Sequence, residues 1–141
     1  MKHAWIVAVV LAASVAALAP QAFATRSAHM GPVIKLSTKK LGPVLATPHH
    51  LALYTWKQEP AGKVRCTAAC AKAWPPLLVM KGEMIEKHVA GIMGTFGQIR
   101  RPDGHTQVTF NRHPLYTYHA DTATKILCNG VDGWFVVRLA H

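Results

Sequence analysis

The segment "HPLYTYHADTATKILC" (residues 113–128) has a close counterpart upstream in "LALYTWKQEPAGKVRC" (residues 51–66). At a constant offset of 62 residues (116 − 54 = 62), Tyr54 aligns with Tyr116, and the two segments end on aligned cysteines. An internal repeat of this kind predicts a fold built from two related units. Equivalent positions in a duplicated fold preserve folding constraints more readily than they duplicate a site, so we interpret the repeat as structural.

The second copy lies in a stretch whose pattern is typical of antiparallel strands. In "GTFGQIRRPDGHTQVTFNRHPLYTY" (residues 94–118), the Asp-Gly pair at 103–104 is a strong hairpin turn and the Asn-Arg pair at 111–112 a weaker one. We therefore expect a three-stranded meander. The chain closes with "WFVVRL" (residues 134–139), whose continuous apolar character predicts a strand that is buried on both faces.

The first copy has the same character with more breaks. "VIKL" (residues 33–36) predicts an edge strand, and "LGPVLATPHHLALYTW" (residues 41–56) predicts two strands around the turn "TPHH". The alanine-rich "CTAACAKAW" (residues 66–74) predicts a short helix, which two prolines end. "LLVMKGEMIEKHVAGIM" (residues 77–93) fits either a short helix or an irregular segment.

Together these patterns predict a mainly β protein. It is a small antiparallel β domain of two degenerate strand-pair repeats, with one short helix around the Cys66-x-x-x-Cys70 segment. The expected organisation is a signal peptide at residues 1–24, a basic lead-in at 25–40, and one domain at 41–141 with repeats at about 41–80 and 92–139.

The amino terminus predicts export. "MKH" supplies a basic start, "AWIVAVVLAASVAALA" is an apolar run too short for a good membrane span, and the small-x-small pattern before residue 25 predicts cleavage after Ala24. We expect no transmembrane segment after cleavage and, because no cysteine lies near the cleavage point, no lipid anchor. The product is expected in the periplasm or outside the cell.

The charge of the chain is strongly positive. It has 16 Lys+Arg and 6 Asp+Glu, and removal of Lys2 with the signal peptide leaves 15 − 6 = +9. The positive residues are scattered and form neither a stripe nor a known nucleic-acid-reading motif, so we expect no nucleic-acid partner. The basic surface makes anionic components of the cell envelope possible partners, although the sequence identifies none of them.

At this point the residues resemble a known family. Tyr116-x-Tyr118-x-x-Asp121 in "LYTYHAD" is similar to the tyrosine–x–aromatic–x–x–aspartate signature of a family of bacterial secreted repeat proteins, which are described as predicted lipoproteins of unknown function. "CTAACAKAWPPLL", "RPDGHTQVTFNRHPLYTY" and "GWFVV" also look like recurrent phrases of that family. The resemblance implies two tandem repeats in an exported bacterial protein, and it implies no activity.

The first copy of the signature is degenerate, since Tyr54-x-Trp56-x-x-Glu59 has glutamate in place of aspartate. The rings two residues apart share one face of a strand and bury much apolar area. A carboxylate in the following turn accepts a tyrosine hydroxyl or caps backbone N–H groups. We therefore interpret the motif as structural, and an aromatic–acidic pocket for a small ligand or cation is the alternative.

The three cysteines predict one disulfide. In an oxidising compartment the closely spaced Cys66 and Cys70 are the first candidates for a bridge. Cys128 is then spare, and it is either buried, paired between molecules or the true partner of one of the other two. It is also absent from the family signature.

A metal site is the alternative use of the cysteines. Soft thiolates suit Cu(I), so Cys66, Cys70, His113 and His119 are the candidate ligands for copper. The histidines are scattered, however, and the βαβ context of the copper chaperones that use Cys-x-x-x-Cys is missing. We therefore favour a protein without a metal or other cofactor.

Catalytic motifs are also missing from the sequence. It has no nucleophile elbow, P-loop or His-Glu-x-x-His, and its six carboxylates form no obvious acid/base pair. We expect a non-catalytic envelope or extracellular protein that acts by binding, with an unknown ligand. The alternative is a periplasmic copper-binding or thiol-redox protein.

Overall fold

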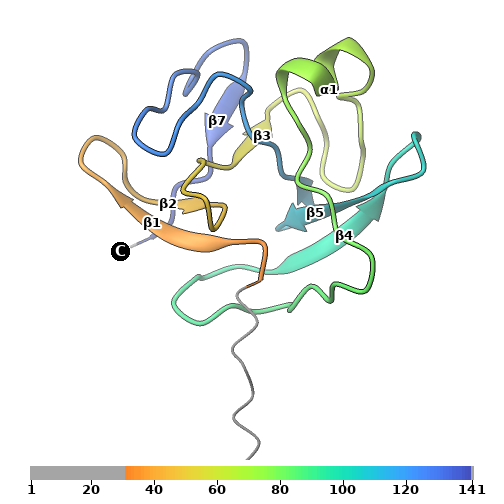
Figure 1. The fold of residues 1–141 in the computed structure, drawn as a ribbon, viewed down its shortest axis with the longest axis horizontal. Coiled ribbons are helices and arrows are strands. Elements are labelled where there is room, and N and C mark those ends of the chain that lie inside the picture. Colours follow the sequence, from red (N-terminus) through yellow and green to blue (C-terminus); the bar gives the residue numbers. More distant parts are fainter. Residues whose placement is uncertain (1–30, 141) are drawn as a thin grey trace, which may run out of the picture.

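The computed structural model describes residues 31–140, so the predicted signal peptide and its cleavage site lie outside the described residues. In chain order the elements are β1 (Ile34–Thr38), β2 (Gly42–Ala46), β3 (Tyr54–Trp56), α1 (Ala69–Ala73), β4 (Phe96–Arg100), β5 (Thr106–Phe110), β6 (His113–Pro114) and β7 (Trp134–Val136). All sheet pairings are antiparallel: β1 with β2, β3 with β7, and β4 with β5 with β6. This confirms the predicted mainly β fold with one short helix (Figure 1). Within the described range, no helix has the length and apolar character needed to cross a membrane.

The predicted meander is present as β4, β5 and β6. The turn between β5 and β6 places both Asn111 (φ 48°) and Arg112 (φ 70°) in the left-handed region. Such a turn has the twist that joins two strands directly, and asparagine tolerates the conformation better than arginine does. β1 lies inside the stretch that the sequence suggested as a lead-in, and it pairs along its whole length with β2. Residues 77–93, which the sequence left open, form no helix.

Three chain segments close into a small triangle of backbone hydrogen bonds in each half of the molecule. In the first half, Leu45 N–H donates to Val137 O (2.9 Å), Val137 N–H to Leu53 O (2.9 Å), and Leu53 N–H to Leu45 O (2.8 Å). Each of these residues thus bonds to the other two, so three short segments satisfy one another without a wide sheet.

The second half repeats this triangle with different residues. Val108 N–H donates to Leu77 O (2.8 Å), Leu77 N–H to Leu115 O (2.9 Å), and Leu115 N–H to Val108 O (3.0 Å). Leu77 follows the first repeat segment along the chain but completes the triangle of the second. Val137 follows the second and completes the triangle of the first. The two halves therefore exchange their third segments.

The halves meet at the two motif tyrosines. Tyr54 N–H donates to Tyr116 O (2.8 Å) and Tyr116 N–H donates to Tyr54 O (3.0 Å), which forms an antiparallel bridge between the repeats. The alternating faces of these segments supply two hydrophobic clusters. One is aliphatic and phenylalanine-rich, around Leu45, Leu53 and Val108, and the other contains the tyrosines and tryptophans.

The prediction for the last strand is wrong in one respect. β7 was expected to be buried on both faces, but only Trp134 and Val136 are buried, and Phe135 between them is 45% exposed. β7 pairs with β3 alone, and one of its faces packs on the aromatic cluster. The continuous apolar sequence was therefore not sufficient to tell a strand buried on one face from a strand buried on both faces.

Candidate functional site

The two copies of the motif hydrogen-bond to each other. The Tyr54 hydroxyl donates to Asp121 Oδ2 at 2.6 Å, and the Tyr116 hydroxyl donates to Glu59 Oε1 at 2.8 Å. Each tyrosine thus reaches the acid of the opposite copy, although the partners lie 67 and 57 residues apart in the sequence. All four of these side chains are buried. The contact is reciprocal, because each copy of the motif supplies the acid that accepts the tyrosine hydroxyl of the other copy.

Each carboxylate also caps the loop that follows it. Glu59 Oε1 accepts the N–H groups of Arg65 (2.6 Å) and Cys66 (3.1 Å). Asp121 Oδ1 accepts the N–H group of Leu127 (2.9 Å), and residue 127 is 65 + 62. The same offset therefore relates the capped positions as well as the motif residues. This geometry is that of side chains fixing a loop.

The oxygens of the two acids are used differently. Both oxygens of Asp121 accept a hydrogen bond, whereas Glu59 Oε1 takes all three donors and its Oε2, although buried, has no partner. Glu59 is 1% exposed, so this unpartnered atom is shielded from solvent. The asymmetry gives the two acids different tolerances to replacement by an amide.

The buried tyrosines resist ionisation. Burial, and next the hydrogen bond to Asp121, raise the pKa of Tyr54 above its ordinary value of about 10. Burial and the hydrogen bond to Glu59 do the same to the pKa of Tyr116. Both hydroxyls therefore remain donors wherever the fold persists. Neither tyrosine is suited to act as a base near neutral pH.

The remaining motif aromatics belong to a packed stack. Trp134 lies between Trp74, at a ring distance of 3.9 Å, and Trp56, at 5.3 Å, with all three rings nearly parallel. Tyr118 packs on Trp74 at 4.7 Å. The Trp56 indole N–H donates to Asp132 O at 3.1 Å. These rings contribute buried apolar area together with the hydrogen-bonding groups that they carry.

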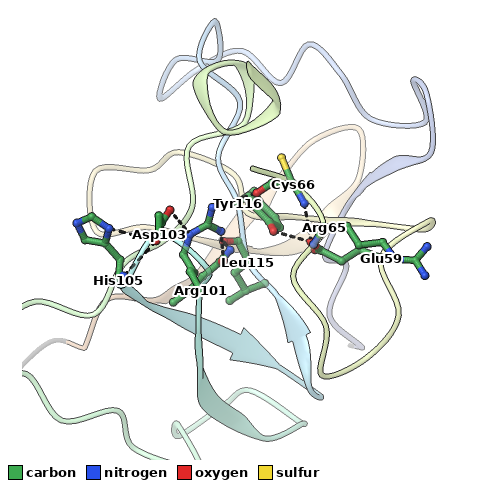
Figure 2. A network of polar contacts seen from close by, with 9 residues as sticks. Glu59, Arg65, Cys66, Arg101, Asp103, His105, Leu115 and Tyr116 are labelled. Carbon is green, nitrogen blue, oxygen red and sulfur yellow. Dashed lines mark hydrogen bonds and ion pairs between the residues drawn. The ribbon is translucent and has the colours of Figure 1, made fainter. Parts of the chain in front are cut away.

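A buried arginine extends the polar network (Figure 2). The side chain of Arg101 is 0% exposed, and its guanidinium donates to Gln107 Oε1 (2.6 Å), to Cys66 O (3.0 Å) and to Asp103 Oδ2 (3.0 Å). The His105 backbone N–H, and next Arg101, lower the pKa of Asp103 to about 2. Because every Arg101 nitrogen has an acceptor, the buried charge is accommodated.

The predicted disulfide is confirmed. Cys66 and Cys70 are bridged with their Cα atoms 5.2 Å apart, at the start of α1, and Cys128 is a free, half-buried thiol. Its thiol is the main cause of a raised pKa for Tyr118. The alternative pairings of Cys128 within one chain are therefore wrong for this oxidised state.

The candidate copper ligands are not gathered. Two of them, Cys66 and Cys70, are consumed by the bridge, while His113 is half-buried at β6 and His119 is exposed with its ring 4.8 Å from that of Tyr118. Among residues 31–140, no three histidine, cysteine or acidic side chains lie together as metal ligands. A copper site at these positions would first require reduction of the bridge.

An open cleft lies at the edge of the molecule, between the tip of the β1–β2 hairpin and the loop before β7. We call it the lysine cleft: it has a volume of about 520 Å³ and is lined by residues 38–41, 124–127 and 129. Three of its lining residues are Lys39, Lys40 and Lys125, and none is acidic. Neither this cleft nor the burial of Arg101 was predicted from the sequence. No sequence pattern indicates the burial of Arg101, because the strand registers align it with the uncharged Thr38 (101 − 63 = 38).

The comparisons with known proteins agree with the resemblance over the second half of the chain. Residues 97–138 match a family described as a secreted repeat of unknown function. The match begins in β4 and extends beyond β7, so it includes Tyr116, Tyr118 and Asp121. No curated protein and no solved structure matches the chain. The chain is thus similar to secreted proteins over this range, and the similarity assigns no activity.

Proposed function

We propose that the chain is an exported, non-catalytic protein that acts by binding, in the bacterial envelope or outside the cell. The observation that supports this most is the reciprocal pairing of the motif: Tyr54 with Asp121 and Tyr116 with Glu59. These side chains were candidates for a ligand-binding site, but they are buried and hydrogen-bonded to one another. A binding partner would therefore contact the exposed surface of the domain rather than the motif residues.

The similarity to secreted repeats supports the exported location, and so does the predicted signal peptide. The excess of basic residues supports a partner that carries negative charge. No cofactor is part of the proposal. The second candidate, copper binding or thiol exchange through Cys66 and Cys70, requires thiols that the bridge removes.

The test is binding by the exported chain (residues 25–141) in its oxidised form. We expect thermal unfolding to shift upward with at least one class of anionic envelope component, since a ligand that binds only the native state stabilises it. Stoichiometric Cu(I) uptake by the untreated protein, lost in Cys70→Ala while the fold persists, would establish the second candidate instead. Absence of any thermal shift over a panel of anionic lipids, glycans and acidic proteins would contradict the binding proposal.

A further inference from the structure

We propose that the lysine cleft binds an anionic amphiphile, meaning a small molecule with a carboxylate or phosphate group on an apolar chain. The inference deepens the proposed binding function and rests on it. It starts from a difference between the two halves of the molecule: the same place in the repeat is filled in one half and open in the other.

In the filled half, the position is occupied by Arg101. Leu45 and Val108 are equivalent, and their partners Lys35 and Gln98 extend an offset of 63 along the two hairpins, so Arg101 corresponds to Thr38 of the cleft (101 − 63 = 38). The cleft loop at 124–129 corresponds to residues 62–67 at the repeat offset of 62 (124 − 62 and 129 − 62). The equivalence is visible in the backbone: Lys63 N–H donates to Pro60 O, and Lys125 N–H donates to Thr122 O. Arg101 reaches this loop through its hydrogen bond to Cys66 O, so the protein's own side chain closes the gap (Figure 2).

In the open half, the partners that hold Arg101 are missing. Asp103, which accepts its Nε–H, is replaced by Lys40 (103 − 63 = 40). Leu45 makes the triangle bonds that Val108 makes, so the buried Gln107 corresponds to Val44. Lys39 and Lys40 are exposed, and Thr38, which takes the place of Arg101, has a short side chain whose hydroxyl donates to Gly42 O within its own turn. The cleft beside it remains unfilled.

The charge of the open cleft favours an anion. Three lysine ammonium groups border it, from residues 39, 40 and 125, and its lining contains no carboxylate. The nearest motif acid, Asp121, is buried and already accepts from Tyr54 and Leu127. Like charges around one cleft repel one another, and an anion between them relieves that repulsion.

The cleft also has an apolar part, formed by Leu41, Ile126 and Leu127 beside the polar Thr38, Thr124 and Asn129. Leu41 and Ile126 are half-buried and Leu127 is 53% exposed, so apolar surface is accessible inside the cleft. A volume of about 520 Å³ lies within the ordinary range for small-molecule sites, which are mostly apolar with a few placed polar groups. A ligand with one acidic end and an apolar body matches both parts of this lining.

The hairpin tip and the loop come from distant parts of the sequence, and Figure 1 shows the tip of the β1–β2 hairpin beside the loop that leads toward β7. Arg138, which follows β7, fixes the hairpin tip, because its Nε–H donates to Leu41 O at 3.1 Å. The loop is fixed separately, because Asp121 Oδ1 and Asn129 Oδ1 accept the N–H groups of Leu127 and Val136. The two walls are therefore held in place without a ligand. A preformed cleft of this kind binds without the cost of ordering a loop.

The test uses the exported chain with three probes below their aggregation concentrations: dodecyl phosphate, inorganic phosphate and dodecanol. We expect saturable one-to-one binding of dodecyl phosphate by isothermal titration calorimetry. Inorganic phosphate and dodecanol should each bind at least about tenfold more weakly, because each lacks one half of the ligand chemistry. Equal affinity for inorganic phosphate would overturn the apolar part of the proposal, and equal affinity for dodecanol would overturn the ionic part.

Variants assign the binding to the cleft. Lys39→Gln/Lys125→Gln should weaken dodecyl phosphate binding by about tenfold, whereas Lys57→Gln/Lys63→Gln, which removes the same charge from exposed positions elsewhere, should leave it unchanged. Leu127→Ser should weaken dodecyl phosphate binding without changing the response to inorganic phosphate. Equal loss in both double variants would overturn the cleft in favour of general electrostatics.

Two further outcomes separate this inference from the proposed function. If phosphatidylglycerol vesicles bind the protein but monomeric dodecyl phosphate does not, surface attraction accounts for the result and the cleft proposal fails while the binding function stands. If no anionic component binds at all, both fail. Thermal melts of every variant confirm that the fold is retained, since the substituted lysines are exposed.

Discussion

At the scale of single residues, the buried tyrosines couple stability to alkaline pH. Unfolded tyrosines ionise near pH 10, whereas the pKa values of Tyr54 and Tyr116 are raised in the folded protein by burial and by their carboxylate partners. Above pH 10 the unfolded chain therefore holds fewer protons than the folded one. The stabilisation is complete below that pH, and it is lost as the pH rises toward the folded-state pKa values.

We predict that the free energy of unfolding falls more gently between pH 10 and 12 in Tyr54→Phe and in Tyr116→Phe than in the wild type, and most gently in the double variant. Near pH 7 each single change should cost about 1–3 kcal/mol, because a buried carboxylate loses a donor. Urea unfolding at a series of pH values measures both effects. Trp56→Phe, which removes no ionisable group, should keep the wild-type slope, and wild-type slopes in the tyrosine variants would contradict the prediction.

The two acids should respond differently to amide substitution. Glu59→Gln keeps an oxygen for the three donors at Oε1 and places the amide nitrogen where Oε2 has no partner, so we expect a cost below about 1 kcal/mol. Asp121→Asn places an amide nitrogen against a hydrogen-bonded position, and should cost about 1–3 kcal/mol. Glu59→Ala leaves three donors without an acceptor, so it is the reference for a large loss of stability. Chemical denaturation gives the order, and equal costs for the two amides would contradict it.

At the scale of elements, the bridge at the start of α1 closes a very short loop. Because the two cysteines are four residues apart, the entropic stabilisation is near the lower end, about 2 kcal/mol. We predict this cost for Cys70→Ala, whose site is half-buried, with the fold retained. Thiol titration in denaturant should find one thiol in the wild type (3 − 2 = 1) and two in Cys70→Ala. Three thiols in the untreated wild type would contradict the bridge.

At this scale, part of the structure could be predicted from the sequence. Local signals predicted the meander, through the Asp-Gly turn at 103–104, and the Cys66–Cys70 bridge, through spacing and compartment. The offset of 62 residues related the two motif copies, but it did not reveal that Tyr54 pairs with Asp121 rather than with the acid of its own copy. This pairing depends on which segments lie together in the folded protein. The sequence pattern does not predict contacts between residues that are 67 positions apart. The burial of Arg101 could not be predicted for the same reason, because its acceptors Gln107 in β5 and Cys66 before α1 come from separate parts of the chain.

At the scale of the whole molecule, the exchanged segments make each half depend on the other. The triangle of the first half needs Val137, and that of the second half needs Leu77. A chain cut between the repeats would therefore leave each fragment without the strand that completes it and with its motif tyrosine facing no acid. The exposed backbone and apolar edges of such a fragment would have too little to bury for independent stability.

We predict that fragments 31–90 and 91–140 are each unfolded alone and regain β structure only when mixed. Far-ultraviolet circular dichroism and amide dispersion in nuclear magnetic resonance spectra measure this directly, and the uncut chain should unfold in a single transition that all probes report together.

The mixture should lose its structure when fragment 91–140 carries Val137→Pro, because proline has no N–H to give to Leu53 O. Phe135→Pro is not an equivalent control, since residue 135 lies within the β3–β7 pairing. Val131→Ala on the exposed loop is the better match, and it should leave reassembly intact. A fragment that folds alone would show that the exchange is not required, and the halves would then be independent domains that happen to pair.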